Sequence, residues 1–259
     1  MSRKATKFEP KQCNSPPVAA GPVILAVETS GRLGSIAIAK GGRLLVERSF
    51  SGPLKHSAEI FPCIEELLSQ LQLPGVIEHI YFDVGPGSFT GIRIAVTIAK
   101  MLSLANDVKI VPVDTLDSIA ENVADFIMET QSKIEHFAVI LDAKRGRFFI
   151  SAYQYNSGKI RKCVEDQIMT VEQFHEYSCK QPTPVWLLGE GLFYYKERFR
   201  SNHTRFIAPE YWNPRACKVH FLGWQHARAG KFADPLRLVP EYLRLPQAEE
   251  TSFRFRNAD

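Results

Sequence analysis

The sequence predicts an α/β protein with two sub-domains, each a mixed β-sheet flanked by helices, the second being reduced in size. Between residues 23 and 129, strand-like segments and apolar rows of helical period follow one another in the order β-β-β-α-β-α-β-α. Residues 130–245 begin again with strand-like segments and repeat this order in a shorter form. With 259 residues, 45% of them hydrophobic, the chain has room for one large domain or two small ones.

Each element of the first sub-domain has its own signal. A nearly continuous apolar run indicates a strand at 23–28, and the tight turn at 40–43 indicates a hairpin. Apolar residues at helical spacing predict a helix at 56–71, in which Pro62 removes one backbone hydrogen bond. The remaining expected elements are strands at 34–40, 44–50, 79–84 and 109–113, and helices at 92–105 and 116–128.

The second sub-domain gives weaker signals. Strands are expected at 137–141 and 147–155, and a turn at 156–158 leads to a third strand at 159–167. A helix at 171–179, a strand at 185–188 and a helix at 214–229 complete the expected elements. The expected organisation is therefore a disordered basic tail at 1–21, sub-domains at 22–129 and 130–245, and a C-terminal tail at 246–259.

The composition argues against disulfides and against a resident metal. Five cysteines lie far apart, and neither a C-x-x-C nor an H-x-x-x-H pair occurs. No apolar run is long enough to span a membrane, so a reducing, cytoplasmic location is expected. The net charge of +4 falls mostly in the first 22 residues, which hold four basic residues and one acidic residue. Net charge therefore gives no argument for nucleic-acid binding.

The most distinctive segment is rich in glycine and reads Gly85-Pro86-Gly87-Ser88-Phe89-Thr90-Gly91-Ile92-Arg93. It follows a strand and begins a helix, which places backbone N–H groups beside the positive end of the helix. Such a turn suits an anion or the close approach of another backbone. It lacks the Lys-Ser/Thr of a phosphate loop and the glycine spacing of a dinucleotide site. The candidate phosphate contacts are Thr29, Ser30, Gly85, Gly87 and Ser88, and they would suit a weak or vestigial site. The hydrogen bonds that hydroxyl side chains commonly make in turns also account for the serines and the threonine.

The helix that follows is apolar around most of its circumference. It also carries a row of small residues at every fourth position, namely Gly91, Ala95, Ala99 and Ser103. A helix this apolar must be covered on two sides. Burial between the sheet and another helix of the same chain would provide this cover, and so would a partner protein.

Two further features have a structural and a functional interpretation. His56 begins a predicted helix and could act as a base, but no nucleophile or carboxylate stands beside it in sequence, which favours a surface or interface histidine. The segment 196–231 interleaves cations with aromatic residues. That pattern is found in RNA-binding surfaces and, more commonly, in solvated charged faces.

Four segments together resemble the bacterial TsaB (YeaZ) family. They are 24–30, 56–62, the glycine-rich segment 85–93, and Pro240-Glu241-Tyr242-Leu243-Arg244. The resemblance is close over residues 23–120 and loose beyond. It implies an actin-like ATPase (ASKHA) fold and a role in forming threonylcarbamoyladenosine in tRNAs that read ANN codons. One departure is Glu28, which stands where such folds usually have an aspartate that organises a metal–phosphate site.

The resemblance also implies a non-catalytic role, with no catalytic or metal residues in this chain and no cofactor required by it. The expected partners are a TsaD-like transferase and a TsaE-like ATPase, with ATP or ADP at the complex interface, tRNA bound through the complex, no membrane, and a homodimer when the chain is alone. The interface residues that we expect are His56, Ile60, Ile64, Gly91, Ile92, Ala95, Ala99, Leu102 and Ser103. The alternatives are an independent actin-fold ATPase or kinase and, less favoured because no G-x-S-x-G or H-E-x-x-H occurs, a peptidase.

Overall fold

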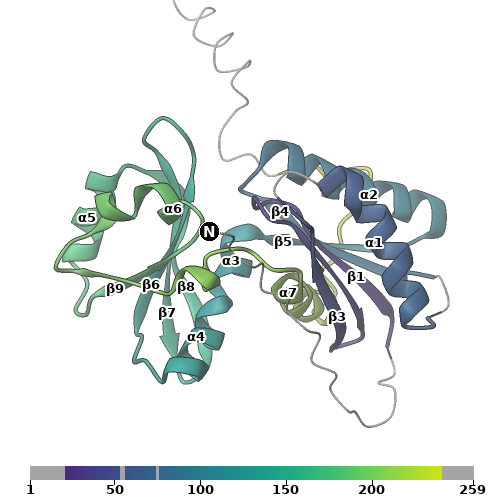
Figure 1. Ribbon diagram of the computed structural model, residues 1–259, viewed down its shortest axis with the longest axis horizontal. Coiled ribbons are helices and arrows are strands. Elements are labelled where there is room, and N and C mark those ends of the chain that lie inside the picture. The colour runs from purple at the N-terminus through teal and green to yellow at the C-terminus, as the bar shows by residue number, and fades with distance from the viewer. Residues whose placement is uncertain (1–20, 53–55, 74–75, 241–259) are drawn as a thin grey trace, which may run out of the picture.

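A computed structural model describes residues 21–52, 56–73 and 76–240, and shows two α/β units side by side (Figure 1). The expected tails lie outside this range apart from Gly21, and so does most of the motif at 240–244. Each unit contains a five-stranded mixed sheet. Within the described residues, no helix combines the length and apolar character needed to cross a membrane.

The first sheet has the strand order β3-β2-β1-β4-β5. Its strands are β1 (Val23–Glu28), β2 (Ser35–Lys40), β3 (Arg43–Ser49), β4 (His79–Gly85) and β5 (Lys109–Asp114). The strands β1, β2 and β3 form an antiparallel meander, whereas β1, β4 and β5 run parallel. Because the carboxyl ends of parallel strands meet at one edge of a sheet, the segments after β1, β4 and β5 lie together there.

Helices cover both faces of this sheet, which explains why β1 reads as a continuous apolar run. Leu25 and Val27 belong to the core under α1 (His56–Gln70) and α2 (Phe89–Asn106). Ile24 and Ala26 point to the opposite face and pack with α7 (Ala216–Arg228). Because successive side chains of a strand point to opposite faces, β1 contributes to two separate hydrophobic cores.

The second sheet has the order β10-β9-β6-β7-β8 and repeats the connectivity of the first. Its elements are β6 (His136–Asp142), β7 (Phe148–Asn156), β8 (Lys159–Met169), α5 (Val171–Cys179), β9 (Val185–Leu188), α6 (Leu192–Tyr195), the 3-10 turn η1 (Lys196–Phe199), β10 (Thr204–Phe206) and a second 3-10 turn η2 (Pro209–Tyr211). The second unit is smaller because its helices are shorter: α6 has 4 residues, whereas α2 of the first unit has 18. The number of strands is the same in both units.

Three helices differ from the sequence expectation. The helix expected at 116–128 is two helices, α3 (Thr115–Ala120) and α4 (Asn122–Thr130), separated at Glu121. Both contribute apolar side chains to the core of the second sheet, although they lie within the expected range 22–129. Conversely, α7 falls in the range 130–245 but packs on β1, β2, β4 and β5 of the first sheet. Each sheet is therefore covered in part by a helix from the other half of the sequence.

Candidate functional site

The segment after β1 packs directly against the glycine-rich turn before α2. The Ser88 N–H donates to the Ser30 carbonyl at 2.7 Å, and the Thr29 hydroxyl donates to the Gly91 carbonyl at 2.7 Å. A Cβ on Gly91 would lie 1.7 Å from the Thr29 carbonyl oxygen, and one on Gly87 would lie 2.7 Å from that of Ser30. These two glycines therefore allow a close approach of backbones, which is one of the two roles that the sequence indicated.

The five candidate phosphate contacts lie at or beside this joint between the two segments, and the hydroxyls of Thr29, Ser30 and Ser88 bond to neighbouring groups of the protein. Thr29 and Ser30 are buried, and the Ser88 hydroxyl caps α2 by accepting from the Gly91 N–H at 3.3 Å. Of the three glycines in the segment, Gly85 alone has a positive φ, 127°. The hydrogen bonds of these residues therefore serve to connect the beginning of α2 with the end of β1.

Two carboxyl groups are buried beneath the joint. Glu28 Oε1 accepts from the Ser30 hydroxyl at 2.7 Å and from the Gly31 N–H at 2.9 Å. Asp83 Oδ2 accepts from the Ser118 hydroxyl at 3.2 Å. The second oxygen of each group, Glu28 Oε2 and Asp83 Oδ1, has no hydrogen-bond partner. Burial raises the pKa of Glu28 to about 8 and that of Asp83 well above its usual value; repulsion by Glu190 adds to the rise at Glu28, and repulsion by Glu28 adds to the rise at Asp83.

Glu28 and Asp83 are residue types that commonly bind metal ions, but they are not arranged as a metal site. No group of three or more His, Cys, Asp or Glu within the described part of the chain is arranged to hold a metal ion. Asp114 adds a third carboxyl at the end of β5, where its side chain caps α3, and burial raises its pKa to about 9. The raised pKa values reflect the cost of burying these carboxylates without a counter-charge. The sequence interpretation singled out Glu28 and missed Asp83 and Asp114, which were detectable as acidic residues at the ends of two further parallel strands.

The loop after β1 also ties the two units together. The Arg32 N–H donates to Glu190 Oε1 at 2.9 Å, and the Arg32 guanidinium donates to the Tyr194 hydroxyl of α6. A Cβ on Gly31 would lie 2.8 Å from Pro214 and 2.9 Å from Glu190 Oε1. Residues 28–32 therefore contact α2 on one side and the second unit on the other.

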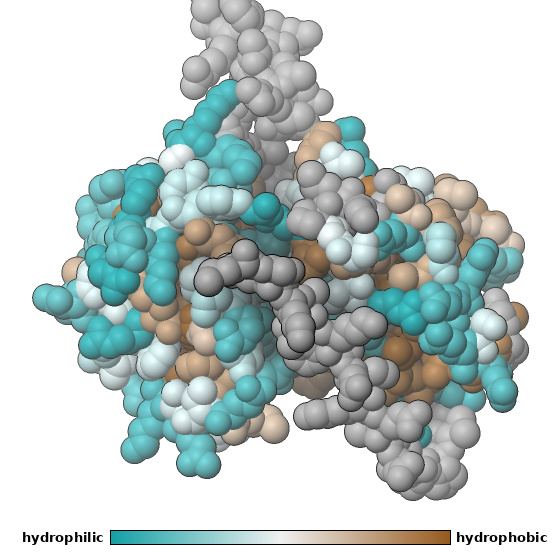
Figure 2. Space-filling view, in the orientation of Figure 1, coloured by the Kyte–Doolittle hydropathy of each residue, from teal (hydrophilic) through white to brown (hydrophobic). Residues whose placement is uncertain are grey.

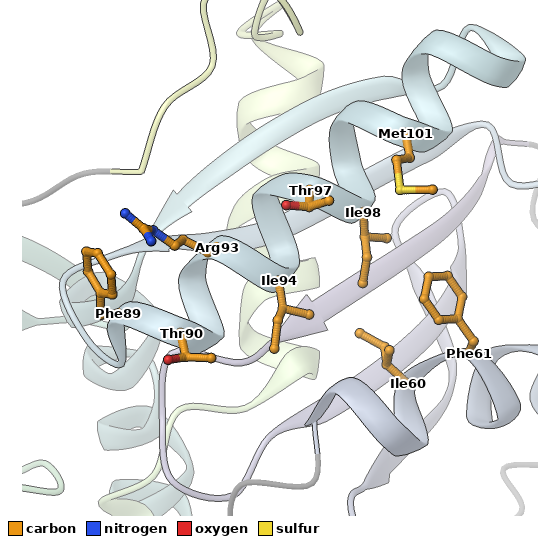
Figure 3. Close-up of a pocket in the computed structure, with 9 residues that line it drawn as sticks. All are labelled: Ile60, Phe61, Phe89, Thr90, Arg93, Ile94, Thr97, Ile98 and Met101. Carbon is orange, nitrogen blue, oxygen red and sulfur yellow. The ribbon is translucent and has the colours of Figure 1, made fainter.

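A groove runs along the outer side of α1 and α2. Ile60 and Phe61 of α1 point toward Ile94, Ile98 and Met101 of α2, and together with neighbouring residues they enclose about 380 Å³ (Figure 3). Phe61 is 50% exposed and Met101 is 58% exposed. The space-filling view also shows hydrophobic residues at the surface of this unit (Figure 2). Exposed apolar side chains grouped around a groove are typical of protein-binding surfaces.

Of the expected interface residues, Ile60 lines this groove, although its side chain is buried. Most of the others do not reach it: Gly91, Ile92, Ala95 and Ala99 are buried against the chain's own sheet, Ile64 is buried between helix and sheet, and Leu102 and Ser103 are half-buried. The side chain of His56 lies outside the described residues. The small-residue row thus serves close packing of α2 on the sheet, because small side chains let the helix lie near β4. The outward side of α2 carries Thr90, Arg93, Thr97 and Met101 instead.

The basic and aromatic segment 196–231 does not form one continuous face. Arg215 pairs with Glu47 and Asp125 at 3.2 Å each, and Lys218 pairs with Asp125 at 2.7 Å, so these cations fasten α7 to neighbouring elements. Phe199, Tyr211 and Trp212 are buried in the second core. The exposed cations of this segment fall into separate groups on η1, β10 and the end of α7.

Comparison with known proteins gives a consistent picture. The family model for TsaD, described as tRNA N6-adenosine threonylcarbamoyltransferase, matches residues 53–235. The TsaB protein of Bacillus subtilis, named a tRNA threonylcarbamoyladenosine biosynthesis protein, is 32% identical over 87% of this chain and 96% of its own length. The TsaB of Escherichia coli is 27% identical over 85% of this chain and 94% of its own.

Solved structures agree on the fold. A Pseudomonas aeruginosa protein described as similar to the peptidase YeaZ superposes with a TM-score of 0.71 at 24% identity, covering 86% of this chain and all of that one. YeaZ of the same organism gives 0.69 at 24% identity, over 85% of this chain and 99% of that one. The two-sheet architecture is therefore shared along almost the whole length of these proteins.

Proposed function

The chain belongs to the TsaB family of tRNA threonylcarbamoyladenosine biosynthesis proteins and has the actin-like ATPase fold, and from this premise we propose that it is a non-catalytic partner of a TsaD-like transferase. In this role it binds the transferase through α1 and α2 and activates the transfer of threonylcarbamoyl to tRNA. A TsaE-like ATPase joins the pair, ATP or ADP binds at the interface between chains, and the complex works in the cytoplasm.

The observation that carries this proposal is the uncovered groove between α1 and α2. Its walls include Phe61, Ile94, Ile98 and Met101, and Leu104, one turn further along α2, is 68% exposed. Exposing this much apolar surface on two neighbouring helices is unfavourable in water, and covering it with another protein removes the cost.

The shape of the groove favours a partner that offers two helices. Because the family model of the transferase matches residues 53–235, which include both α1 and α2, a TsaD-like protein has a corresponding pair of helices to offer. Two helices from each chain would form a four-helix arrangement with its apolar residues inside. A second copy of this chain could complete the same arrangement, so a homodimer would compete with the heterodimer.

The joint beside α2 supports the absence of catalysis in this chain. The hydroxyls of Thr29 and Ser30 are engaged by Gly91 and Glu28, and the carboxyl groups of Glu28 and Asp83 carry raised pKa values. An independent ATPase or kinase is the competing function, and titration of the isolated chain with ATP and Mg²⁺ separates the two, since tight binding with turnover would favour the ATPase.

The function is tested by co-purifying tagged chain with the TsaD-like protein of the same cell and then assaying tRNA modification with and without this chain. We expect a stoichiometric complex and threonylcarbamoyladenosine only when the chain is present. Modification at an unchanged rate without the chain would contradict the proposal, and so would failure of the two proteins to associate.

A further inference from the structure

We propose that the loop 143–147 and the adjoining turn η1 form a surface that binds the phosphate backbone of tRNA. This inference rests on the proposed function for the identity of the RNA, but the surface itself is argued from this chain. It lies in the second unit, and none of its residues belongs to the joint of residues 28–32 or to the groove on α1 and α2.

The loop holds two long cations in an unfavourable backbone conformation. Lys144, Arg145 and Gly146 have φ values of 66°, 56° and 71°, which lie in the left-handed region. Hairpin turns of this kind normally use Asn, Asp or Gly, because other L-residues crowd their own backbone there. Two consecutive non-glycine residues in this conformation carry a backbone cost, and such strain is concentrated at functional sites of proteins.

The loop is nevertheless well defined by its own hydrogen bonds. The Ala143 N–H donates to the Arg147 carbonyl at 3.0 Å, and the Arg147 N–H donates to that of Lys144 at 3.1 Å. Asp142 accepts from the Lys144 N–H at 2.7 Å and pairs with its ammonium group at 2.8 Å. The side chains of Lys144, Arg145 and Arg147 are consequently presented to solvent from a fixed turn.

The turn η1 brings a further arginine to the same place. A Cβ on Gly146 would lie 4.0 Å from Arg198 Nη1, so this guanidinium adjoins the loop. Its backbone is held by His175, whose Nε2 donates to the Arg198 carbonyl at 3.0 Å. The next residue, Phe199, is fully buried against Phe148, the first residue of β7, which directly follows Arg147 in the chain. The packed phenylalanines therefore fix the position of Arg198 relative to Arg147.

The surface has an excess of positive charge. The stretches 142–147 and 196–200 together contain six cationic and two anionic side chains, and the two acids are already paired, Asp142 with Lys144 and Glu197 with Arg200. In the described ranges, neither Arg147 nor Arg198 lies within salt-bridge distance of an acidic side chain, and Glu172 of α5 interacts with Arg198 at longer range. Guanidinium groups that no close carboxylate occupies can form bidentate, charge-assisted hydrogen bonds with phosphates.

Aromatic residues beside η1 favour RNA over a small anion. On α6, which immediately precedes η1, Phe193 is 45% exposed and Tyr194 is 66% exposed, with the Arg32 guanidinium 5.3 Å from the centroid of the Tyr194 ring. Exposed rings next to a basic surface can stack on unpaired bases, as in single-stranded loops of RNA. A single phosphate or nucleotide would need only one of these groups, whereas the cations here extend over two segments of chain.

The test compares charge reversals at two places in the full-length chain bound to its TsaD-like partner. The probe is an unmodified tRNA transcript that reads an ANN codon, and its affinity is measured by fluorescence anisotropy at several salt concentrations. For the double variant Arg147→Glu/Arg198→Glu we expect at least a tenfold loss of affinity. The slope of log affinity against log salt should become shallower by about 0.7 to 0.9 for each phosphate that the surface no longer binds.

The matched control is Arg228→Glu/Lys231→Glu, which changes the charge equally at exposed sites near the end of α7. It should retain the affinity and the salt slope of the unaltered chain. Circular dichroism and partner binding verify folding, and the neutral variant Arg147→Gln/Arg198→Gln gives a second measurement if the charge reversal disturbs the fold. The proposal would be overturned if the two charge-reversal variants lost tRNA affinity equally, or if neither lost any. It would also be overturned if millimolar ATP displaced the tRNA effectively. An unaltered chain that fails to support tRNA modification would instead count against the proposed function.

Discussion

The two units carry equivalent hairpins after their first strands, yet the loops of these hairpins have opposite character. The loop after β1 begins with the buried residues Thr29, Ser30 and Gly31 and packs so closely on α2 that Gly91 has no room for a side chain. The loop after β6 exposes Lys144 and Arg145, and the nearest atom to a Cβ on Gly146 would be Arg198 Nη1 at 4.0 Å. The comparison teaches that one topology can serve internal packing in the first unit and a solvent-exposed surface in the second.

The largest effect on stability is expected for Gly91→Ala, which tests the close packing at the first loop. The added methyl group would lie 1.7 Å from the Thr29 carbonyl oxygen, so the segment after β1 and the first turn of α2 must move apart. We expect a loss of unfolding free energy of about 3 kcal/mol or more, at the upper end of overpacking effects. Urea denaturation measures it, and a stability within about 1 kcal/mol of the unaltered chain would show that the joint is not tightly packed.

The next largest effect is expected on association rather than on stability. Met101→Arg puts a charge into the groove on α1 and α2 while leaving the inner, sheet-facing side of α2 unchanged. Affinity for the TsaD-like partner should fall about 30-fold, equivalent to about 2 kcal/mol, as for a central interface residue. Ala99→Arg, in contrast, should prevent folding because Ala99 is fully buried.

The control for the groove variant is Met128→Arg, which places the same substitution at an exposed residue of α4. Sedimentation velocity and pull-down should show unchanged association for this control. If Met101→Arg also binds the partner normally, another surface must form the interface.

The buried carboxyl groups of Glu28 in β1 and Asp83 in β4 predict that the stability of the protein depends on pH. Because the folded-state pKa of Glu28 is raised from 4.5 to about 8, its contribution is fully favourable below pH 4.5 and is lost as the pH rises toward 8. Stability should decrease over this window by up to about 1.4 kcal/mol per pH unit from this group, with Asp83 acting in the same direction.

The substitution Glu28→Gln removes this titration and should flatten the dependence of stability on pH. Compared with the unaltered chain, the variant should therefore perform better at pH 8 than at pH 5. Thermal unfolding across pH 5–8 measures the effect, with the exposed Glu135→Gln as a control. A wild-type profile that rises between pH 5 and pH 8 would contradict the buried, protonated state.

The smallest expected effect is that of Gly146→Ala in the second loop. Here the cost comes from the backbone, because φ is 71°, and not from a clash, since the nearest heavy atom is 4.0 Å away. We expect a loss of about 1 kcal/mol, clearly less than for Gly91→Ala. Denaturation of both variants under one condition decides the comparison, and a reversed order would mean that the two glycines have been assigned the wrong roles.

Much of the fold could be predicted from the sequence. The strand at 185–188 and the helix at 171–179 have the expected bounds, because turn residues and the Thr170 cap delimit them locally. The short β10 and α6 were missed, since three or four residues give too weak a period to detect. Nor could periodicity tell that α7 covers the first sheet, because it shows which face of a helix is apolar but not which sheet it meets.

The candidate site was predictable in part. The glycine-rich turn indicated a close backbone approach, and the helices that line the groove were expected to form a surface. The row Gly91, Ala95 and Ala99 was assigned to the partner, yet small residues suit packing against a sheet as well as against another helix. The loop 143–147 could not be recognised, since its left-handed backbone is not visible in a Lys-Arg-Gly sequence.

The most direct test of the proposed role is the amount of threonylcarbamoyladenosine in tRNA from cells whose own copy of this chain is depleted and replaced. Mass spectrometry of digested tRNA would compare replacement by the unaltered chain, by Met101→Arg and by Met128→Arg. We expect normal modification with the first and the last, and a strong loss with Met101→Arg despite a normal level of folded protein. Full modification in cells that carry only Met101→Arg, or none of this chain, would contradict a role that depends on the groove of α1 and α2.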